Sequence, residues 1–365
     1  MLEKGRISSW QMALLLYTNV IATSVLTAPG VAFHYAERDL WLSPIWASLI
    51  GFLALYLAWK LHSIYIHKTF IQYTEQIIGK IPGMILSFLY IFYFTVGTGI
   101  ALRQYAEFIV GAFLNQTPIL IVMGTMMLAT SIALRGGLEV AARLAEIFTP
   151  ILFLLWVILM ILLIPELKIT SIFPVMEKGL SPSLKGAIVL QSFYALFFYV
   201  SFLLPYIRDQ KKSLSWGYYS VITAVGTLVI TNLTTLLLFG NITGDFLYPI
   251  MSAARYISYA DFFENLESLV MLIWVGGSFI KLGLMQFVVV NSISQWLNLT
   301  DYKPLSLPAG LIITIIAYWV FPNVAEMTSY FQNTFLGIPI LFVFVPAGLL
   351  LISFLRKWLG LKLAK

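Results

Sequence analysis

Residues 19–31, with the sequence NVIATSVLTAPGV, lie in the middle of the chain's first apolar stretch, which spans residues 10–33. An apolar stretch of this length is long enough to cross a lipid bilayer as a helix. Residues 19–31 form a poor helix, because they bring three hydroxyl groups to membrane depth and a proline that lacks the N–H of the helical ladder. The residues concerned are Thr23, Ser24, Thr27 and Pro29.

Two interpretations of this stretch are open from the sequence. Inside a bilayer, a loosened helix is tolerated where it faces protein or a water-filled cavity. In the first interpretation, two half-helices meet at mid-membrane, and the N–H groups at the positive end of a helix dipole bind a carboxylate. In the second, the span is kinked by its Ser, Thr and Pro residues and binds no ligand.

The composition of the 365 residues is that of a polytopic membrane protein. Hydrophobic residues make up 60% of the chain and charged residues 10%, whereas soluble domains carry roughly 25% charged residues. The chain has no cysteine, which excludes disulfides, a thiolate nucleophile and cysteine metal ligands. The first apolar stretch is too long for the hydrophobic region of a signal peptide, so we expect it to be retained as the first span.

Apolar windows predict an all-α protein with ten membrane spans in a single transmembrane domain, residues 1–365. The windows lie near residues 10–34, 41–63, 83–112, 118–134, 144–164, 187–206, 215–239, 265–293, 306–321 and 334–355.

The distribution of Lys and Arg predicts that both termini are cytoplasmic. With the N-terminus inside, fifteen of the 22 Lys and Arg residues fall in inside loops, five in outside loops, and two, Arg103 and Lys281, within spans. Basic residues prefer cytoplasmic loops of membrane proteins. This preference also accounts for the net charge of +6, so we expect no nucleic-acid partner.

Ten spans divide into two halves of five, at about residues 10–164 and 187–355, and a five-span repeat must insert the second time with opposite topology. The first span of the second half contains QSFYALFFYVSFLLP at residues 191–205, which also mixes polar side chains with a proline. Irregular spans at matching positions of two halves indicate a binding site at the midplane of an inverted-repeat transporter. We expect the walls of this pocket to be formed by Phe197, Phe198 and Tyr199. The alternative is that these aromatic side chains face lipid.

The third span carries Arg103 and Glu107, which lie one helical turn apart on the same face. A lone charge at the centre of a membrane helix costs roughly 2.5–3.5 kcal/mol, and this spacing lets the two side chains neutralise each other. The pair either braces the bundle or forms a gate that faces the cavity.

Lys281 in the eighth span lies within GGSFIKLG, residues 276–283, whose glycines allow close approach of another helix. In one interpretation its ammonium replaces the cation that sodium-coupled proteins of this architecture hold between spans 1 and 8. In the other it extends toward the cytoplasm or pairs with an acid such as Glu139 or Glu146.

Catalytic and metal-binding patterns are missing from the sequence. His34, His62 and His67 lie at span ends or in loops without metal-ligand spacing. No nucleophile–base arrangement or HExxH-type pair appears. The sequence therefore predicts no enzyme, no metal site and no cofactor.

Several short motifs occur in a specific order along nearly the whole chain. They are NVIATSVLTAP at 19–29, Arg103 followed by AE at 106–107, FPV at 173–175, GLSP at 179–182, KG at 185–186, LP at 204–205, FE at 263–264 and ES at 267–268. With these motifs the chain resembles the B-subunit family of GerA-type spore germinant receptors, which are spore germination permeases of the amino acid–polyamine–organocation superfamily.

The resemblance implies a LeuT-like bundle with a 5+5 inverted repeat and broken helices 1 and 6, in the inner membrane of a bacterial spore. It implies a nutrient germinant, usually an amino acid, bound between spans 1, 3, 6 and 8. It further implies a larger membrane A subunit and a lipoprotein C subunit as partners, with which binding leads to ion release and germination.

The chain departs from the family pattern at two places. Where relatives often have Gly-x-Gly in span 1, this chain has Ala22, Thr23 and Ser24. Where relatives often have a glycine and an acid two residues apart in span 6, it has Phe197 and Tyr199. The first departure weakens the case for a carboxylate bound by bare backbone, and the second predicts a bulkier and more apolar pocket.

The hypothesis from the sequence is therefore a nutrient-sensing receptor subunit with a permease fold. A proton-coupled amino acid transporter is one alternative, and a structural subunit without its own ligand is another. The expected ligand contacts are Thr23, Ser24, Val25, Thr27, Phe197, Phe198 and Tyr199, and the expected coupling or gating residues are Arg103, Glu107 and Lys281.

Overall fold

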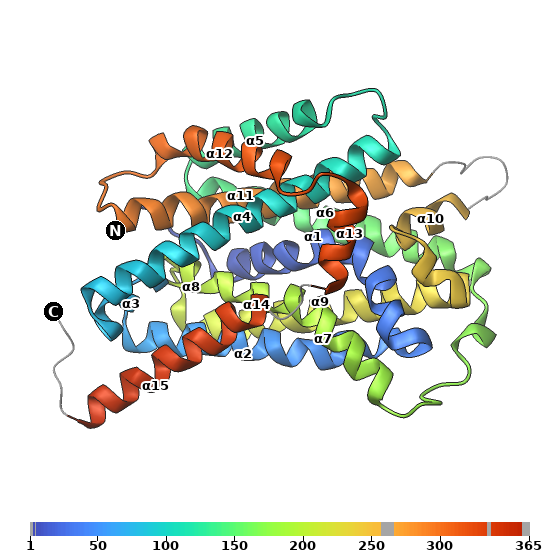
Figure 1. Ribbon diagram of the computed structural model, residues 1–365, viewed down its shortest axis with the longest axis horizontal. Coiled ribbons are helices and arrows are strands. Elements are labelled where there is room, and N and C mark those ends of the chain that lie inside the picture. The colour runs from blue at the N-terminus through green and yellow to red at the C-terminus, as the bar shows by residue number, and fades with distance from the viewer. Residues whose placement is uncertain (1–2, 4, 257–265, 334–336, 360–365) are drawn as a thin grey trace.

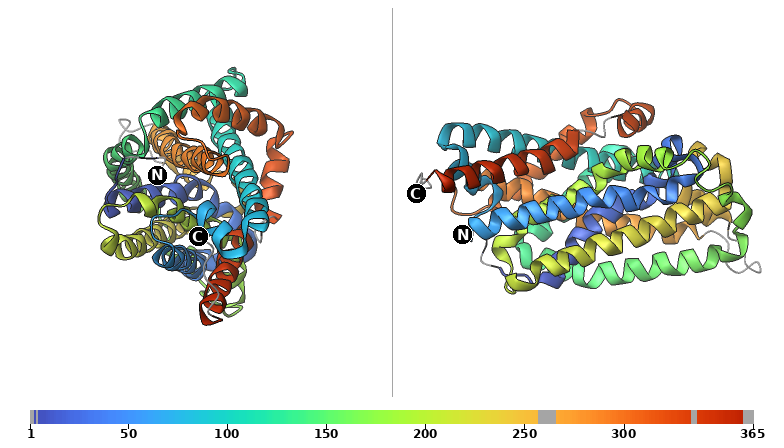
Figure 2. Two further views of the ribbon diagram at one scale, coloured as in Figure 1. Left: turned by 90° about the vertical axis from the view of Figure 1, so that its left-hand side faces the viewer. Right: turned by 90° about the horizontal axis from the view of Figure 1, so that it is seen from below.

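The computed structural model describes residues 3, 5–256, 266–333 and 337–359, and these residues form helices and no β-strand. The helices lie side by side in one elongated bundle (Figure 1). The start of α1 and the end of α15 lie at the same end of the bundle, as both views in Figures 1 and 2 show. We call this end the terminal end and the other the far end.

Within the described residues, each predicted apolar window lies mainly on helix. The long helices are α1 (Ser9–Ala36), α2 (Ser43–Ile64), α4 (Lys80–Ala112), α5 (Ile119–Arg135), α6 (Leu138–Leu163), α9 (Gln210–Phe239), α11 (Glu267–Trp296), α12 (Ser306–Trp319) and α15 (Val345–Trp358). The sixth span is built from α7 (Ser181–Ala195), η4 (Leu196–Tyr199), α8 (Val200–Leu203) and η5 (Leu204–Tyr206). Shorter helices are α3 (Phe70–Ile78), α10 (Pro249–Tyr256), α13 (Val324–Asn333) and α14 (Gly337–Pro339).

Eight helices in the described part of the chain are long and apolar enough to cross a membrane. A ninth span results if α12 and α13, which meet at an angle of 97°, are taken together. The remaining window corresponds to α5, whose 17 residues are at the short limit for a membrane helix. The total of ten spans therefore stays a prediction.

Helix α1 is continuous, and the predicted break in span 1 is wrong. The hydroxyl of Ser24 donates to the carbonyl of Val20 at 2.9 Å, and that of Thr27 donates to the carbonyl of Thr23 at 3.0 Å. Hydroxyl groups bonded in this way satisfy themselves on their own helix. The stretch is therefore compatible with an uninterrupted helix, and Pro29 is accommodated inside α1.

The sixth span is irregular where the sequence predicts it, although the helix is not interrupted there but tightens into a 3₁₀ turn. The α-helix of α7 ends at Ala195, and the next four residues form a turn of 3₁₀ helix, which contains Phe197, Phe198 and Tyr199. A stretch of 3₁₀ helix inside a span often marks a functional site or a hinge.

Helix α1 is the central helix of the bundle. In its most apolar window 89% of residues are buried, against 33% for α6. It packs against α6, α7, α9 and α11, so residues on its different faces contact different parts of the bundle.

Candidate functional site

A cavity of about 120 Å³ lies between α1, α4, the sixth span, α11 and α13. This volume exceeds the 10–15 Å³ or so that a single water molecule needs. Its walls are largely apolar and aromatic. They are formed by Thr23, Val31, Tyr93, Val96, Gly97, Ile100, Ala101, Gln104, Ser192, Phe193, Leu196, Tyr199, Lys281, Met285, Tyr330, Phe331 and Ile338.

Lys281 is the single charged residue among these wall residues. Only 4% of it is exposed, and its ammonium donates to the hydroxyl of Thr23 at 2.8 Å. An ammonium has three N–H donors, and Thr23 is its one hydrogen-bond partner within the described residues. A buried cation with unfilled donors is costly, so the cavity favours an anionic group beside Lys281.

Gln104 adds a second polar group to the wall. Its side chain is buried, and its amide nitrogen Nε2 has no hydrogen-bond partner within the described residues. Buried amide groups are normally bonded. An ammonium and a free amide N–H in one cavity together suit an acceptor such as a carboxylate.

The cavity is closed toward the terminal end of the bundle by packed aromatic rings. Two rings stack on that of Phe342: Phe94, with 5.7 Å between ring centroids, and Phe198, with 5.4 Å. Phe202 contacts Phe94 edge to face at 5.1 Å. A small solute cannot pass this cluster without moving it.

The N-terminal segment fastens the same end. The amide of Ile7 donates to the carbonyl of Tyr206 at 3.0 Å, and the amide of Arg208 donates to the carbonyl of Ile7 at 2.9 Å. The amide of Ser9 donates to the carboxylate of Asp209 at 2.7 Å. These bonds tie the start of α1 to the end of the sixth span.

Glu3 joins this segment to two further elements. Its carboxylate accepts from the amide of Leu138, the first residue of α6, at 2.9 Å, and from the hydroxyl of Tyr302. Burial by itself would raise the pKa of Glu3, but the bonds from Leu138, Tyr302 and Gly5 outweigh it and lower the pKa below its ordinary value. Glu3 is therefore a charged contact between the N-terminus, α6 and the loop before α12.

The comparison with known sequences assigns the family. The family model described as spore germination protein matches residues 6–346. This chain belongs to the spore germination protein family. Within it, spore germination protein KB of Bacillus subtilis (strain 168) is 28% identical over 367 residues, which cover 97% of this chain and 94% of that relative.

Solved transporter structures share the fold of this spore germination protein. A Na⁺-coupled sialic acid symporter in a substrate-bound outward-open state matches with a TM-score of 0.63 at 13% identity, over 93% of this chain and 80% of that one. MhsT in complex with L-phenylalanine matches with a TM-score of 0.54 at 15% identity, over 98% of this chain and 91% of that one. The expected LeuT-like fold is confirmed.

The structure places the candidate ligand contacts of the spore germination protein in different environments. Thr23 and Tyr199 line the cavity, whereas the hydroxyls of Ser24 and Thr27 are directed to their own helix. Val25 borders a separate apolar cavity on another face of α1. Phe197 and Phe198 are fully buried beside the cavity without lining it.

Lys281 contacts Thr23 of span 1, and the alternative that it pairs with Glu139 or Glu146 is wrong. The carboxylate of Glu139 is bonded to Arg143 at 2.6 Å, and that of Glu146 accepts from Gln11 at 2.8 Å. The lysine therefore takes a position between spans 1 and 8.

Arg103 and Glu107 form the predicted ion pair, with 2.7 Å between Nε and Oε1. Neither residue lines the cavity. Arg103 also donates from Nη1 to the carbonyl of Tyr318, near the C-terminal end of α12, at 3.0 Å. A cation at a helix C-terminus is favourable, so Arg103 braces the bend between α12 and α13.

Helix α13 forms a wall of the cavity that the sequence analysis missed. It runs across the direction of its neighbours in Figure 1 and supplies Tyr330 and Phe331 to the cavity. The ring of Tyr330 contacts Phe321, in the bend, at 5.3 Å. The signal that could have found α13 is the short segment of polar and aromatic residues between two apolar windows, residues 324–333.

Gln104 was also missed, although a polar amide next to Arg103 at membrane depth is itself a signal.

Among the described residues, no group of three or more His, Asp and Glu side chains could hold a metal ion.

Proposed function

We propose that this chain is the membrane subunit of a spore germinant receptor and that it binds a small nutrient, an amino acid, in the cavity between α1, α4, the sixth span and α11. The observation that carries the proposal is Lys281, a buried cation in the cavity wall whose one hydrogen-bond partner in the described chain is Thr23. A ligand carboxylate supplies the missing negative charge, and the free amide N–H of Gln104 gives it a second donor.

The walls support an amino acid with an apolar side chain. Apart from Lys281, the lining contains no charged residue, and aromatic and aliphatic side chains form most of the surface. The hydroxyls of Ser192 and Tyr199 are available to accept from the ammonium of the ligand. L-Phenylalanine is the ligand of one solved structure of the same fold, MhsT, which supports the same ligand class here.

The signal follows from a difference in affinity between two states of the bundle, because a ligand shifts an equilibrium only through such a difference. The bound carboxylate stabilises the arrangement in which Thr23 on α1 and Lys281 on α11 lie next to each other. We propose that this arrangement is transmitted to a germinant-receptor A subunit and a lipoprotein C subunit, as family membership supports. Co-purification of the three chains from spores tests the partnership, and recovery of this chain from spores without either partner would contradict it.

The binding site is tested by filling the cavity. Gly97 lines it, and a Cβ placed on Gly97 meets nothing within 4 Å. In Gly97→Phe the added ring occupies the ligand volume without displacing backbone. Gly111 on the same helix also has open space around it and lies outside the cavity, so Gly111→Phe is the matched control.

Binding of labelled L-amino acids is measured on purified protein in liposomes. We expect saturable binding by the unmodified chain and by Gly111→Phe, and none by Gly97→Phe. Equal binding by the two variants would contradict this site.

The second candidate function is a proton-coupled amino acid transporter. The contact of Lys281 with span 1 favours it, because a lysine in this position that gains and loses a proton could take the place of a transported cation. Uptake by the same liposomes under an imposed pH gradient separates the two functions. Accumulation inside the liposomes would establish the transporter, and binding without accumulation would support the receptor.

A further inference from the structure

An apolar groove of about 310 Å³ opens on the side of the bundle between α1, α6 and α9. Trp10 and Tyr219 on its rim are 40% and 59% exposed. Trp216 contacts both, with 5.0 Å between its ring centroid and that of Trp10 and 5.6 Å to that of Tyr219. In a protein of this family such an exposed apolar surface faces the bilayer, so the groove is open to lipid.

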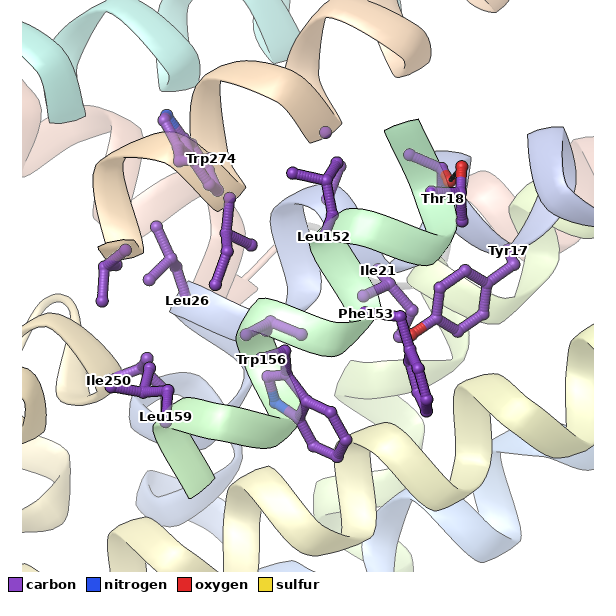
Figure 3. A pocket seen from close by; sticks show the side chains of 16 residues that line it. Tyr17, Thr18, Ile21, Leu26, Leu152, Phe153, Trp156, Leu159, Ile250 and Trp274 are labelled. Carbon is purple, nitrogen blue, oxygen red and sulfur yellow. Dashed lines mark hydrogen bonds between the residues drawn. The ribbon is translucent and has the colours of Figure 1, made fainter. Parts of the chain in front are cut away.

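The groove leads to a smaller interior cavity of about 40 Å³ between α1, α6 and α11 (Figure 3). Tyr17, Thr149 and Phe153 line both spaces. In Figure 3 Tyr17 and Phe153 lie together at one end of the interior cavity, and Leu159 and Ile250 lie at the other. The two spaces therefore adjoin at the Tyr17–Phe153 pair, whose ring centroids are 6.2 Å apart.

Within the described residues, the polar side chains that line the interior cavity are hydrogen-bonded to protein groups, and the hydroxyls of Thr18 and Thr149 bond to each other at 2.8 Å. The hydroxyl of Tyr17 is bonded to Thr227 at 3.0 Å, and the indole N–H groups of Trp156 and Trp274 donate to Thr231 at 3.1 Å and to the carbonyl of Tyr105 at 3.3 Å. Apolar cavities without free polar groups stay dry and accept hydrocarbon. The volume of the interior cavity suits the end of an acyl chain and not a whole lipid molecule.

Basic residues lie at the terminal end of the groove. Lys211 and Lys212 are exposed in the first turn of α9, one to two turns before Trp216. Tryptophan is typical of the interface between membrane and water, and exposed lysines there attract anionic headgroups. The charge thus lies where the headgroup of a lipid in the groove would be.

We propose that an anionic phospholipid occupies this groove, with its headgroup at Lys211 and Lys212 and the end of one acyl chain past Tyr17 and Phe153 in the interior cavity. Lipid tails are as apolar as the groove, so the gain comes from filling the void with van der Waals contacts. The proposal is independent of the nutrient site.

With the end of its acyl chain in the interior cavity, the lipid contacts α1. The interior cavity is lined by Ala22 and Gly277, and a Cβ on Gly277 would lie 3.1 Å from Cβ of Ala22. The neighbouring residue Thr23 and, one turn along α11, Lys281 face the other cavity. The acyl chain therefore touches the helix pair that carries the Thr23–Lys281 contact, on its opposite side.

The test uses phosphatidylglycerol with a diazirine near the end of one acyl chain, in nanodiscs that contain the full chain. After photolysis, mass spectrometry locates the adducts. We expect them to concentrate on the segments that contain Tyr17, Phe153 and Trp156. Adducts spread evenly over all lipid-facing helices would overturn the proposal.

A matched pair of variants tests the path of the acyl chain. Thr223 on α9 lines the groove and is exposed, so Thr223→Trp blocks it without entering the core. The adjacent Ile222 is 55% exposed and lies outside the groove, which makes Ile222→Trp the control. We expect several-fold fewer interior adducts in Thr223→Trp and no change in Ile222→Trp.

Unchanged labelling in Thr223→Trp would overturn the proposal. Two experiments test the role of the headgroup. In one, the diazirine is carried by phosphatidylcholine instead of phosphatidylglycerol, and in the other the double variant Lys211→Gln, Lys212→Gln is labelled. Weaker labelling in either case is expected, and equal labelling would overturn the assignment of an anionic lipid.

Discussion

Arg103 on α4 donates from Nη1 to the carbonyl oxygen of Tyr318 at 3.0 Å, while its Nε pairs with Glu107 at 2.7 Å. The first bond joins the helix that carries Gln104 to the bend that positions α13. The second neutralises the guanidinium inside the membrane. A single side chain thus links one wall of the candidate nutrient site to another.

Replacement of Arg103 by Gln is expected to destabilise the protein, because it leaves Glu107, whose side chain is 12% exposed, as an unpaired carboxylate. Breaking a buried pair costs about 3–5 kcal/mol. The thermal unfolding midpoint in detergent should fall, and Glu107→Gln added to Arg103→Gln should restore part of it. A double variant no more stable than the single one would contradict this account.

The bend itself can be measured, because the chain contains no cysteine and pairs of spin labels can be attached without background. Labels at Leu311 on α12 and Glu326 on α13 should give one narrow distance distribution. We expect a broader distribution in Arg103→Gln. An unchanged distribution would show that Arg103 does not hold the bend.

Replacement of Lys281 by Met is expected to weaken binding and to stabilise the unliganded protein. Loss of a charged hydrogen bond of about 1.5–3 kcal/mol lowers affinity for a carboxylate ligand about 10- to 150-fold. Thr23 is the one hydrogen-bond partner of the buried ammonium in the part of the chain that the structure describes, so an apolar side chain of similar length removes a desolvation cost. Thermal unfolding and ligand binding of the same sample check both parts, and a less stable variant with normal affinity would contradict them.

Gly99 is expected to tolerate no side chain. A Cβ on Gly99 would lie 2.8 Å from Cγ2 of Ile316 and 3.2 Å from the backbone nitrogen of Ala317. Overpacking of this kind costs about 1–3 kcal/mol, so Gly99→Ala should lower the unfolding midpoint. Gly111→Ala on the same helix meets nothing within 4 Å and should not lower it.

The contacts of Glu3 predict a pH-dependent contribution to stability. Because the folded chain lowers the pKa of Glu3, its contribution is present above the unfolded pKa of about 4.3 and is lost as the pH falls through the folded pKa. Hydrogen bonds to charged groups contribute about 1.5–3 kcal/mol. The unfolding midpoint of Glu3→Gln should therefore lie below that of the unmodified chain at pH 7, and the gap should narrow below about pH 4.

The control for this effect is Glu166→Gln, which changes an exposed carboxyl at the end of the 3₁₀ helix η2 (Ile164–Glu166) after α6. Because a substitution at an exposed site usually changes stability by less than about 0.5 kcal/mol, its midpoint at pH 7 should stay close to that of the unmodified chain. A gap for Glu3→Gln that stays constant down to pH 3 would contradict the assignment to this carboxylate.

The sequence located the helices because their signals are local. Each apolar window is a property of about twenty adjacent residues, and the Arg103–Glu107 pair follows from a spacing of four residues on one helix. The irregular turn at 196–199 lies inside the stretch of the sixth span that the sequence had singled out.

What the sequence could not determine depends on distant residues. The contact between Thr23 and Lys281 joins residues 258 positions apart. The continuity of α1 was misjudged because Ser and Thr are ambiguous: their hydroxyls can open a helix toward a ligand or bond back to the preceding turn, as Ser24 and Thr27 do. The side of the helix that each residue faces decides the outcome, and that depends on the whole bundle.

The uninterrupted α1 has a consequence for how spore germination proteins diversify. Exposed backbone amides at a helix break recognise the group that all amino acids share, and no substitution other than one to proline removes such an N–H. In this chain the candidate anion site is a side chain, Lys281, on an intact scaffold. A single codon change there alters the charge of the candidate site while the backbone stays the same, so paralogous chains can change the charge of this cavity without rebuilding the fold.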